Sequence, residues 1–520
     1  MNRLLSAFLL SLGTLSAEAL DIPEIFSDNM IVQQQTEAKL WGWADRNSYV
    51  TVSTSWDGKT YTATVGDDGK WTAEVRTPEA SFAQYTITIE ERAQKAKGTK
   101  ARKTQKEEGD AIDSRTIRGV MAGEVWFCSG QSNMEMPLGG FWNCPVEGAN
   151  DAILHSARYS HAIRVVTVPK RDALEPQKKV EGRWEVCSPE NAARFTACGY
   201  FFATTLVDAL NVPVGIINCS WGGSCVEGWL PKDTLLTYPD GLTPMDDTDY
   251  HRKMVMFNGM LAPLAGYTIK GFLWNQGESN VGREKEYIDR FKTMTRLWRK
   301  MWRQPGDKLP IYTVELPPYR YGDVDGTAAA DFRAAQHEIA RQLEHCGCVC
   351  TADLIYEHEV DQIHGAQKRQ IGERLALLAL TRDYGMKGVA ADAPEYEECV
   401  VTDADEAEQA VIAGTAVGNN PNAKGKVLHL YFSNSYDGFD RMAGIEGFEA
   451  QDSKGVWHKA LAWSASAWQN VKRQGCFIAL ACPEADVIKA VRYRYHNFCI
   501  GTLHNMRGLP VVPFTAKVGE

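Results

Sequence analysis

The sequence lacks a long hydrophobic run and an excess of positive charge. No segment after the N-terminus approaches the roughly 18 unbroken apolar residues that indicate a membrane-spanning helix. The formal net charge of −10 argues against nucleic acid or an anionic membrane surface as a partner. We therefore expect a protein that neither inserts into a membrane nor binds nucleic acid.

The cysteines show no regular framework of spacings. Their number, 13, is odd, so at least one is unpaired or pairs between chains. Cys346, Cys348 and Cys350 alternate in what reads as a buried strand, where a free cysteine behaves as a small hydrophobic residue. The nearest histidines lack the spacing of metal ligands, so we expect no metal, and nothing in the sequence calls for an organic cofactor.

The N-terminus has the layout of a secretory signal peptide. Arg3 supplies a positive charge, residues 4–15 form an apolar stretch, and Ala17-Glu18-Ala19 resembles a cleavage site. The apolar stretch is too short for a spanning helix. We expect residues 1–19 to be removed and the mature protein to be secreted or periplasmic.

A chain of 520 residues is too long for one hydrophobic core, so two to four domains are expected. Residues 20–118 are typical of a β-sandwich domain, because short alternating strands are separated by turn residues such as Asp57-Gly58. The expected strands include residues 39–43, 49–53 and 85–89. Residues 90–108 are highly charged and read as an exposed loop, with a binding patch as the alternative.

Residues 119–390 alternate apolar strands with longer helical segments, and this pattern predicts a parallel sheet covered by helices on both faces. Ligands of such sheets bind beyond the carboxyl ends of the strands. The expected strands are residues 124–128, 215–219, 271–274 and 310–314, and the expected helices are 196–210, 284–302, 328–343 and 367–382.

Residues 391–520 return to strand-like composition, with residues 426–432 and 490–495 as clear examples. We interpret them as a second β-rich domain. It either forms a separate sandwich or packs with the N-terminal one.

The strongest chemical signal is Ser132 within Gly130-Gln131-Ser132-Asn133-Met134, directly after an expected strand. A serine at a strand-to-helix turn can present its hydroxyl at the edge of the sheet, and its own N–H can contribute to an oxyanion site. Serine needs a positioned base to act as a nucleophile at neutral pH. The flanking residues are not the G-x-S-x-G elbow of the α/β-hydrolases.

Three further blocks follow later strands. Gly222 and Gly223 stand where a backbone can approach a ligand closely, although paired glycines are also common in ordinary turns. Gln276 and Asn280 lie in a polar cluster after an apolar run, where an amide can donate to an oxyanion. Asp361 and His364 share one loop, so the carboxylate could orient the imidazole that takes a proton from serine.

The order of these blocks resembles the SGNH hydrolase superfamily and, more narrowly, the sialate O-acetylesterase family. The likeness spans nearly the whole mature chain, from residues 25–33 and 41–44 through residues 128–138 and 275–280 to residues 508–514. The resemblance implies an SGNH-type three-layer α/β/α catalytic domain with a parallel sheet, flanked by β-sandwich-like N- and C-terminal regions.

The resemblance also implies an acyl-enzyme mechanism with Ser132 as nucleophile, His364 as general base and Asp361 as its orienting acid. Asp361 varies in the family, so Asp353, Glu357, Glu359 or a backbone carbonyl remain alternatives. The oxyanion hole is expected to use the N–H groups of Ser132 and of Gly222 or Gly223, with a side-chain amide from Gln276 in preference to Asn280. The residues expected to bind substrate are Gln131, Asn133, Trp274 and Glu278. For Glu278 we favour a supporting role in the site over that of a catalytic acid.

The expected reaction is removal of O-acetyl groups from sialic acid, at its glycerol side chain. The first alternative is an acetylesterase acting on acetylated xylan or another polysaccharide, which would use the same serine chemistry. A remote alternative is a carbohydrate-binding protein on an inactive hydrolase scaffold. A sialate carboxylate favours an arginine partner, and Arg183, Arg283 and Arg320 are the candidates because they lie near the blocks.

Overall fold

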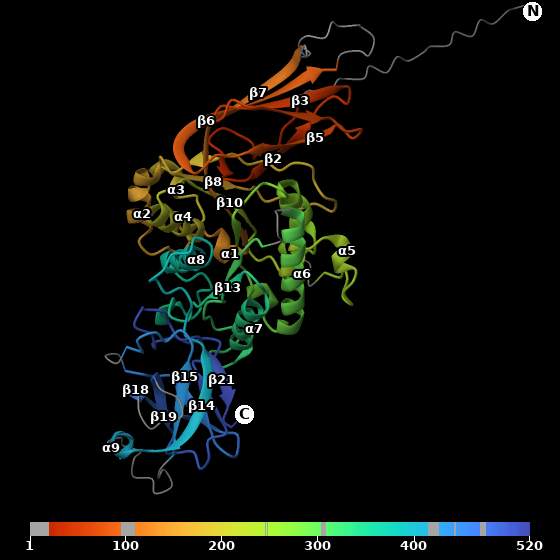
Figure 1. The fold of residues 1–520 in the computed structure, drawn as a ribbon. Helices are drawn as coiled ribbons and strands as arrows, with labels where there is room; N and C mark the ends of the chain where they lie inside the picture. The colour runs from red at the N-terminus through yellow and green to blue at the C-terminus, as the bar shows by residue number, and fades with distance from the viewer. Residues whose placement is uncertain are drawn as a thin grey trace, which may run out of the picture.

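A computed structural model of the chain describes residues 20–94, 110–244, 246, 248–302, 308–413, 426–440, 444–467 and 475–519. The expected signal peptide, residues 1–19, lies outside the described residues, as does most of the charged stretch at 90–108. Three regions follow one another along a single long axis, with the N-terminal strands at one end and the C-terminal strands at the other (Figure 1). The two β-rich regions therefore do not pack together.

The N-terminal region is built from two antiparallel layers. One layer has the order β4-β3-β6-β7, with β1 added parallel to β7, and the other pairs β2 with β5. The strands are β1 (Ile31–Gln33), β2 (Glu37–Trp43), β3 (Ser48–Thr54), β4 (Thr60–Thr64), β5 (Lys70–Arg76), β6 (Ser81–Ala93) and β7 (Ala111–Gly130). The start of the expected charged loop is wrong, because residues 90–93 belong to β6 and Glu91 is buried, accepting the N–H of Asp45.

Strand β7 links the first two regions, since its first half pairs with β6 and its second half lies in the central sheet. The boundary that we place at residues 118/119 falls within this strand, at Gly119, where φ is +67°. A side chain there would meet Asn29 Oδ1 at 2.8 Å, so the close approach requires glycine.

The central sheet has the order β13-β12-β11-β7-β10-β8-β9 and is parallel apart from the two-residue edge strand β9. This confirms the expected α/β class. The additional strands are β8 (Ile163–Thr167), β9 (Glu185–Val186), β10 (Val214–Ser220), β11 (Gly271–Asn275), β12 (Ile311–Val314) and β13 (Cys346–Val349).

Helices cover both faces of this sheet. Side chains of α6 and α7 join one core, whereas α4 and α8 join the core on the opposite face. The α-helices are α1 (Ser132–Glu135), α2 (Ala149–His155), α3 (Pro189–Ala192), α4 (Ala197–Leu210), α5 (Lys232–Leu235), α6 (Glu284–Trp302), α7 (Ala328–Gln342) and α8 (Lys368–Arg382). Short helical turns are η1 (Ser156–Tyr159), η2 (Val226–Trp229), η3 (Asp249–His251), η4 (Phe257–Leu261), η5 (Ala262–Leu264), η6 (Glu278–Asn280) and η7 (Glu357–Glu359).

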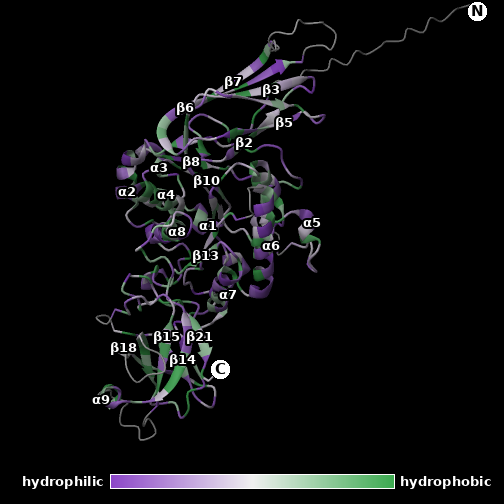
Figure 2. Ribbon diagram, viewed as in Figure 1, coloured by the Kyte–Doolittle hydropathy of each residue, from purple (hydrophilic) through white to green (hydrophobic). Residues whose placement is uncertain are grey.

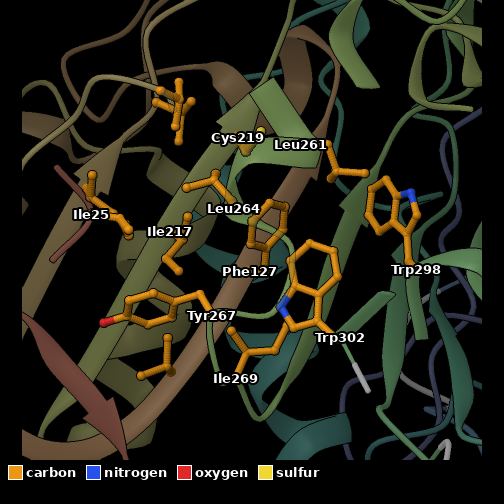
Figure 3. Close-up of a cluster of buried hydrophobic side chains, with 14 of the residues drawn as sticks. Ile25, Phe127, Ile217, Cys219, Leu261, Leu264, Tyr267, Ile269, Trp298 and Trp302 are labelled. Atoms are coloured by element: carbon orange, nitrogen blue, oxygen red, sulfur yellow. The ribbon is translucent and has the colours of Figure 1, made fainter. Parts of the chain in front are cut away.

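The two cores follow from simple periodicities in the sequence. Along β7, Val125 and Phe127 face one core while Trp126 and Cys128 face the other, as a strand buried on both faces requires. Helix α6 places an apolar stripe inward and polar residues outward, and Figure 2 shows both kinds along its length. Figure 3 shows Phe127 of β7 in the same cluster as residues from α6, including Trp298 and Trp302.

The first core does not stop at the domain boundary. It joins side chains of the N-terminal strands, such as Val50 and Ile87, to those under α6 in one continuous cluster. In addition, the Tyr267 hydroxyl donates to the carbonyl of Ile31 at 2.8 Å across this junction. The N-terminal region is therefore packed firmly on the side of the sheet that α6 covers.

The C-terminal region is a sandwich of two antiparallel four-stranded sheets, ordered β14-β15-β19-β18 and β17-β16-β20-β21, around its own core. Its elements are β14 (Tyr396–Asp403), α9 (Glu406–Ala413), β15 (Lys426–Phe432), β16 (Phe448–Gln451), β17 (Trp457–Lys459), β18 (Leu461–Ala467), β19 (Gly475–Ala481), β20 (Ala490–Tyr493) and β21 (Phe514–Lys517). The expected strand 490–495 ends at Tyr493, because Arg494 has a φ of +46° and turns the chain away.

The described residues contain no helix with both the length and the apolarity needed to cross a bilayer. All 13 cysteines lie in the described residues, and all are free.

Candidate active site

Ser132 is presented by a sharp turn between β7 and α1. Gly130 has a φ of +134°, and a side chain there would lie 2.1 Å from the carbonyl oxygen of Asn275. The N–H of Gln131 donates to that same carbonyl at 2.9 Å. The turn is thus locked against the end of β11, and it leaves Ser132 as the first residue of α1, partly exposed at the carboxyl edge of the sheet.

His364 meets this serine although 232 residues separate them in the chain. Its Nε2 lies 2.8 Å from Ser132 Oγ. The loop that carries it runs from β13 to α8 and is braced by Glu359, whose carboxylate accepts the N–H groups of Tyr356 and Ala366, each at 2.9 Å. Ser132 and His364 therefore have the separation that proton transfer requires.

The environment of His364 keeps its imidazole neutral. Burial, together with the charge of Lys368, lowers its pKa to about 4. A neutral imidazole can accept the serine proton at Nε2, provided that Nδ1 carries the ring hydrogen. The site thus holds a base that is ready at neutral and mildly acidic pH.

Beneath the pair lies a buried polar network built on Asn133. Lys368 Nζ donates to Asn133 Oδ1 at 2.8 Å, and Asn133 Nδ2 donates to Glu278 Oε1 at 2.5 Å and to the carbonyl of Ile363 at 3.1 Å. Burial raises the pKa of Glu278 and lowers that of Lys368. Asn133 and Glu278 were expected to bind substrate, but Asn133 is buried, and the hydrogen bond between it and the half-buried Glu278 joins the nucleophile turn to the segment after β11. Asn133 also ties this turn to the loop of His364.

Asp361 does not contact His364, which corrects the expected triad. Its carboxylate is bound in bidentate fashion by Arg320, from Nε at 2.6 Å and from Nη2 at 3.0 Å. The Asp361 side chain is 67% exposed, so solvent and Arg320 satisfy it outside the site. Three residues of separation allowed a contact, but the loop turns the carboxylate outward.

None of the alternative carboxylates orients the imidazole within the described residues. Asp353 is paired with Arg374 and His504, Glu359 braces the loop, and Glu357 lies exposed on η7. His364 Nδ1 instead faces the thiol of Cys144 at 3.9 Å, and the ring of Phe141 packs edge-on against the imidazole at 5.3 Å.

The expected oxyanion hole is only partly supported by the geometry. A side chain on Gly222 would lie 3.3 Å from Ser132 Cβ, so this turn does reach the nucleophile. However, the N–H of Gly222 already donates to Glu135 Oε2 at 2.5 Å, which corrects its expected role. The N–H groups of Ser132 and Gly223 have no acceptor among the described residues, and they remain available to an oxyanion.

Gln276 and Asn280 are not placed to complete this hole, contrary to our preference for Gln276. Gln276 is fully buried, and its amide donates to the carbonyl of Ser224 at 3.0 Å and to Asn280 Oδ1 at 2.8 Å. Asn280 donates in turn to the buried carboxylate of Glu227. The side-chain N–H groups of both residues therefore donate to buried groups of the protein and not to an oxyanion.

Two of the remaining expected substrate contacts also lie inside. Trp274 is fully buried, with its indole N–H donating to the Tyr287 hydroxyl at 3.2 Å, so it cannot touch a substrate. Gln131 accepts the N–H of Gly277 at 3.2 Å and ties the nucleophile turn to the loop after β11. Its Nε2 has no partner in the described part of the chain.

The three arginines considered for a sialate carboxylate are all engaged by acidic residues. Arg183 pairs with Glu24 at 3.6 Å, and Arg283 pairs with Glu227 at 3.0 Å. Arg320 is held by Asp361, as described above. The described residues also bring together no cluster of His, Cys, Asp and Glu that could hold a metal ion.

Sequence reasoning missed Lys368, Cys144 and Glu135, each of which touches the site. Lys368 is the first residue of α8, four residues after His364. This position, close to His364 in the sequence, was the signal that could have identified it. No local signal pointed to Cys144, because the antiparallel bridge between Phe141 and Cys144 brings it to the imidazole only in the folded chain.

Comparison with known proteins gives the family. A family model described as carbohydrate esterase, sialic acid-specific acetylesterase, matches residues 122–381, which is half of the chain. The sialate O-acetylesterase of Homo sapiens is 32% identical over 194 residues, covering 35% of this chain and 36% of the human protein. The sialate O-acetylesterase of Mus musculus is 26% identical over 329 residues, covering 54% and 60% respectively. The chain thus matches between about a third and three fifths of the length of these relatives.

A solved structure resembles the whole fold. It is a carbohydrate acetylesterase from Xanthomonas citri, with a TM-score of 0.76 and 25% identity over 96% of this chain and 99% of that one. Its likeness extends over both flanking β-rich regions. From the family match and this agreement in fold, the chain belongs to the carbohydrate esterase family of sialic acid-specific acetylesterases, a family of carboxylic ester hydrolases.

Proposed function

We propose that this protein is a serine esterase that removes O-acetyl groups from a sugar through an acyl-enzyme. The observation that carries the proposal is the 2.8 Å separation between Ser132 Oγ and His364 Nε2 at the edge of the sheet. The family match and the acetylesterase named among similar structures support the same reaction class.

In the first half of the reaction, Ser132 Oγ attacks the acetyl carbonyl while His364 Nε2 takes the serine proton. The negative charge of the tetrahedral intermediate falls near the N–H groups of Ser132 and Gly223. His364 then gives its proton to the departing sugar oxygen, and the acetyl group stays on Ser132. In the second half, His364 activates a water molecule, which releases acetate and restores the serine.

This proposal uses a Ser–His pair without a carboxylate. Lacking an acidic partner, the imidazolium formed during the reaction is stabilised less than in a triad. The low pKa of His364 has the same origin, because burial and Lys368 both disfavour the protonated ring. The fixed geometry of the Ser132–His364 pair offsets part of this weaker stabilisation, because the Asn133 network and Glu359 hold the loop of His364 in place.

We propose O-acetylated sialic acid, esterified on its glycerol side chain, as the first substrate to test, because the matching family and the mammalian relatives carry that name. The second candidate is an acetylated neutral polysaccharide such as acetylxylan. One observation bears on it: the three arginines that the sequence offered for a sialate carboxylate each pair with an acidic residue of the protein, namely Glu24, Glu227 and Asp361.

The first experiment compares the wild type with Ser132→Ala on 4-nitrophenyl acetate. We expect at least about a thousandfold loss of kcat, since removing the nucleophile leaves only residual catalysis. Ser53→Ala, on the exposed face of β3, is the matched control and should leave kcat unchanged. Equal hydrolysis by Ser132→Ala would remove the esterase proposal and favour a carbohydrate-binding protein. Acetate release from O-acetylated sialic acid and from acetylxylan, measured side by side, then separates the two substrates.

We also propose that the mature protein is secreted or periplasmic. Residues 1–19 lie outside the described residues, so the proposal rests on their sequence pattern. N-terminal sequencing of exported protein should begin at Leu20, and recovery of the full-length chain only inside the cell would contradict it.

A further inference from the structure

Exposed aromatic side chains gather around the candidate site. In the described part of the chain, four large aromatic side chains are exposed, namely Trp142, Tyr250, Tyr356 and Tyr436. Three of them lie on loops that contact the Ser132–His364 pair or its glycine turn, and only Tyr436 belongs to the C-terminal sandwich. Trp142 stands out, because 90% of its surface is open to solvent.

Trp142 sits at the tip of a tight turn that rests on the catalytic imidazole. The residues on either side form an antiparallel bridge, with the N–H of Phe141 donating to the carbonyl of Cys144 and the reverse, both at 3.0 Å. Phe141 packs on the His364 ring and the Cys144 thiol faces His364 Nδ1. The turn is fixed further by Asn143, with a φ of +59°. The turn that carries Trp142 is therefore held against His364, while the indole itself is almost wholly exposed.

Burial does not account for an indole in this position. A tryptophan left almost wholly in water gains nothing for the fold, and it keeps about its full apolar surface available to a ligand. A second exposed aromatic residue, Tyr250, lies against the glycine turn, where its ring is 2.6 Å from the position at which a side chain on Gly223 would begin. Tyr250 thus packs on the glycine turn beside the nucleophile, in a segment separate from the turn of Trp142.

We propose that Trp142 is a specificity-determining residue that stacks on the pyranose ring of the sugar released by the reaction. This inference rests on the proposed esterase function. His364 must deliver its proton to the leaving sugar oxygen, so the sugar lies on the His364 side of Ser132, and the turn that carries Trp142 packs on His364. One face of a pyranose ring presents C–H groups, and a flat aromatic ring packs against such a face with little loss of side-chain entropy.

The proposal concerns the sugar and not the acetyl group, which gives it a selective test. The probes are 9-O-acetyl-N-acetylneuraminic acid, acetylated xylo-oligosaccharides and ethyl acetate, whose alcohol has no ring to stack. For each sugar ester that the wild type cleaves, we expect Trp142→Ala to raise KM about tenfold with kcat within about twofold, because stacking binds ground state and transition state alike. Ethyl acetate hydrolysis should be unchanged, and Trp142→Phe should be intermediate.

The matched control is Tyr436→Ala, which removes an exposed aromatic ring far along the chain and should leave every value unchanged. Truncating a side chain as exposed as Trp142 should also leave the melting temperature unchanged. An equal loss on ethyl acetate would overturn the inference, since Trp142 would then support the His364 loop. An unchanged KM for sugar esters would overturn it as well. If the wild type releases acetate from neither sugar ester, the proposed function fails and the inference fails with it.

Discussion

Two polar clusters both include residues of the turn after β11, but they differ in role. The catalytic cluster consists of Ser132, His364, Asn133, Lys368 and Glu278, and the scaffold cluster consists of Glu227, Gln276, Asn280, Arg283 and Arg290. The short segment of residues 276–280 contributes to both, because Glu278 accepts from Asn133, whereas Gln276 donates to Asn280 and Asn280 donates to Glu227. A polar residue at the edge of a parallel sheet is therefore not by itself a catalytic one.

The clusters differ in how completely their charges are compensated. Glu227 is fully buried and accepts from Arg283, Arg290 and Asn280, so that, although burial alone raises the pKa of its carboxyl, these partners bring the pKa below its usual value. His364 has no acidic partner among the described residues, and burial together with the charge of Lys368 lowers its pKa, so it remains a usable base. A buried charge whose partners satisfy it fully helps to form a rigid scaffold. A titratable group without such a partner, lying next to solvent, can take part in catalysis.

The largest expected effect comes from breaking the scaffold cluster. Glu227→Ala leaves Arg290 buried without its main partner, and we expect a loss of about 3–5 kcal/mol in the free energy of unfolding, measured by urea denaturation. Glu37→Ala, which removes an exposed carboxylate paired with Arg76, is the control and should cost less than about 0.5 kcal/mol. Similar losses in the two variants would show that the cluster is not the scaffold described here.

Gln276→Ala separates the scaffold role from the oxyanion role. Because both donors of Gln276 bond to buried groups, we expect a loss of about 1–3 kcal/mol in the free energy of unfolding and less than about threefold in kcat per folded molecule. Gln409→Ala, on the exposed face of α9, is the matched control for stability. A hundredfold fall in kcat with an unchanged melting temperature would return Gln276 to the oxyanion hole.

Lys368→Met tests the electrostatics of the catalytic cluster. In the wild type, kcat/KM should fall only as the pH drops towards about 4, where His364 takes up a proton and can no longer accept one from Ser132. Removing the positive charge of Lys368 raises the pKa of His364, so the acidic limb should move to higher pH by up to about one unit. The pH profile of 4-nitrophenyl acetate hydrolysis measures this shift. Lys59→Met, at an exposed lysine, should not move the limb.

The smallest effect is expected for Asp361→Asn. The carboxylate is exposed and paired with Arg320, so its loss should change kcat/KM less than about threefold and leave the pH profile in place. A true triad aspartate would cost about 10⁴-fold in kcat. A fall of that order, absent in Arg320→Gln, would place Asp361 back in contact with His364 during turnover.

Periodicity in the sequence predicts the core elements closely, because their residues signal their own burial. The apolar runs predict strands β10 and β11, and the helical spacing of apolar residues predicts helices α6 and α7, close to where the structure has them. The failures occur where the deciding contact is remote or the backbone is unusual. Residues 90–92 are charged but lie in β6, and strand β20 ends at Tyr493, before Arg494, whose positive φ no local pattern predicts.

The sequence likewise predicts one part of the site and not the other. Motif spacing predicts that Ser132 and His364 come together, since each follows its own strand of one sheet and the carboxyl ends of parallel strands meet at one edge. It does not predict the partners of those residues. Asp361 is taken by Arg320, which lies 41 residues earlier, and the N–H of Gly222 is taken by Glu135, 87 residues away.

The sequence by itself determined the α/β core, the sharp turn at Gly130 that exposes the Ser132 hydroxyl, and the edge of the sheet at which chemistry can occur. These features depend on local backbone geometry and on the periodicity of apolar residues, which the chain carries in every short segment. Only the tertiary structure decided that Gln276 and Asn280 face inward, that burial and Lys368 lower the pKa of His364 with no carboxylate beside it, and that Trp142 remains in water. Burial and hydrogen-bond partnership are set by segments far apart in the chain, so they exist only once the fold has brought those segments together.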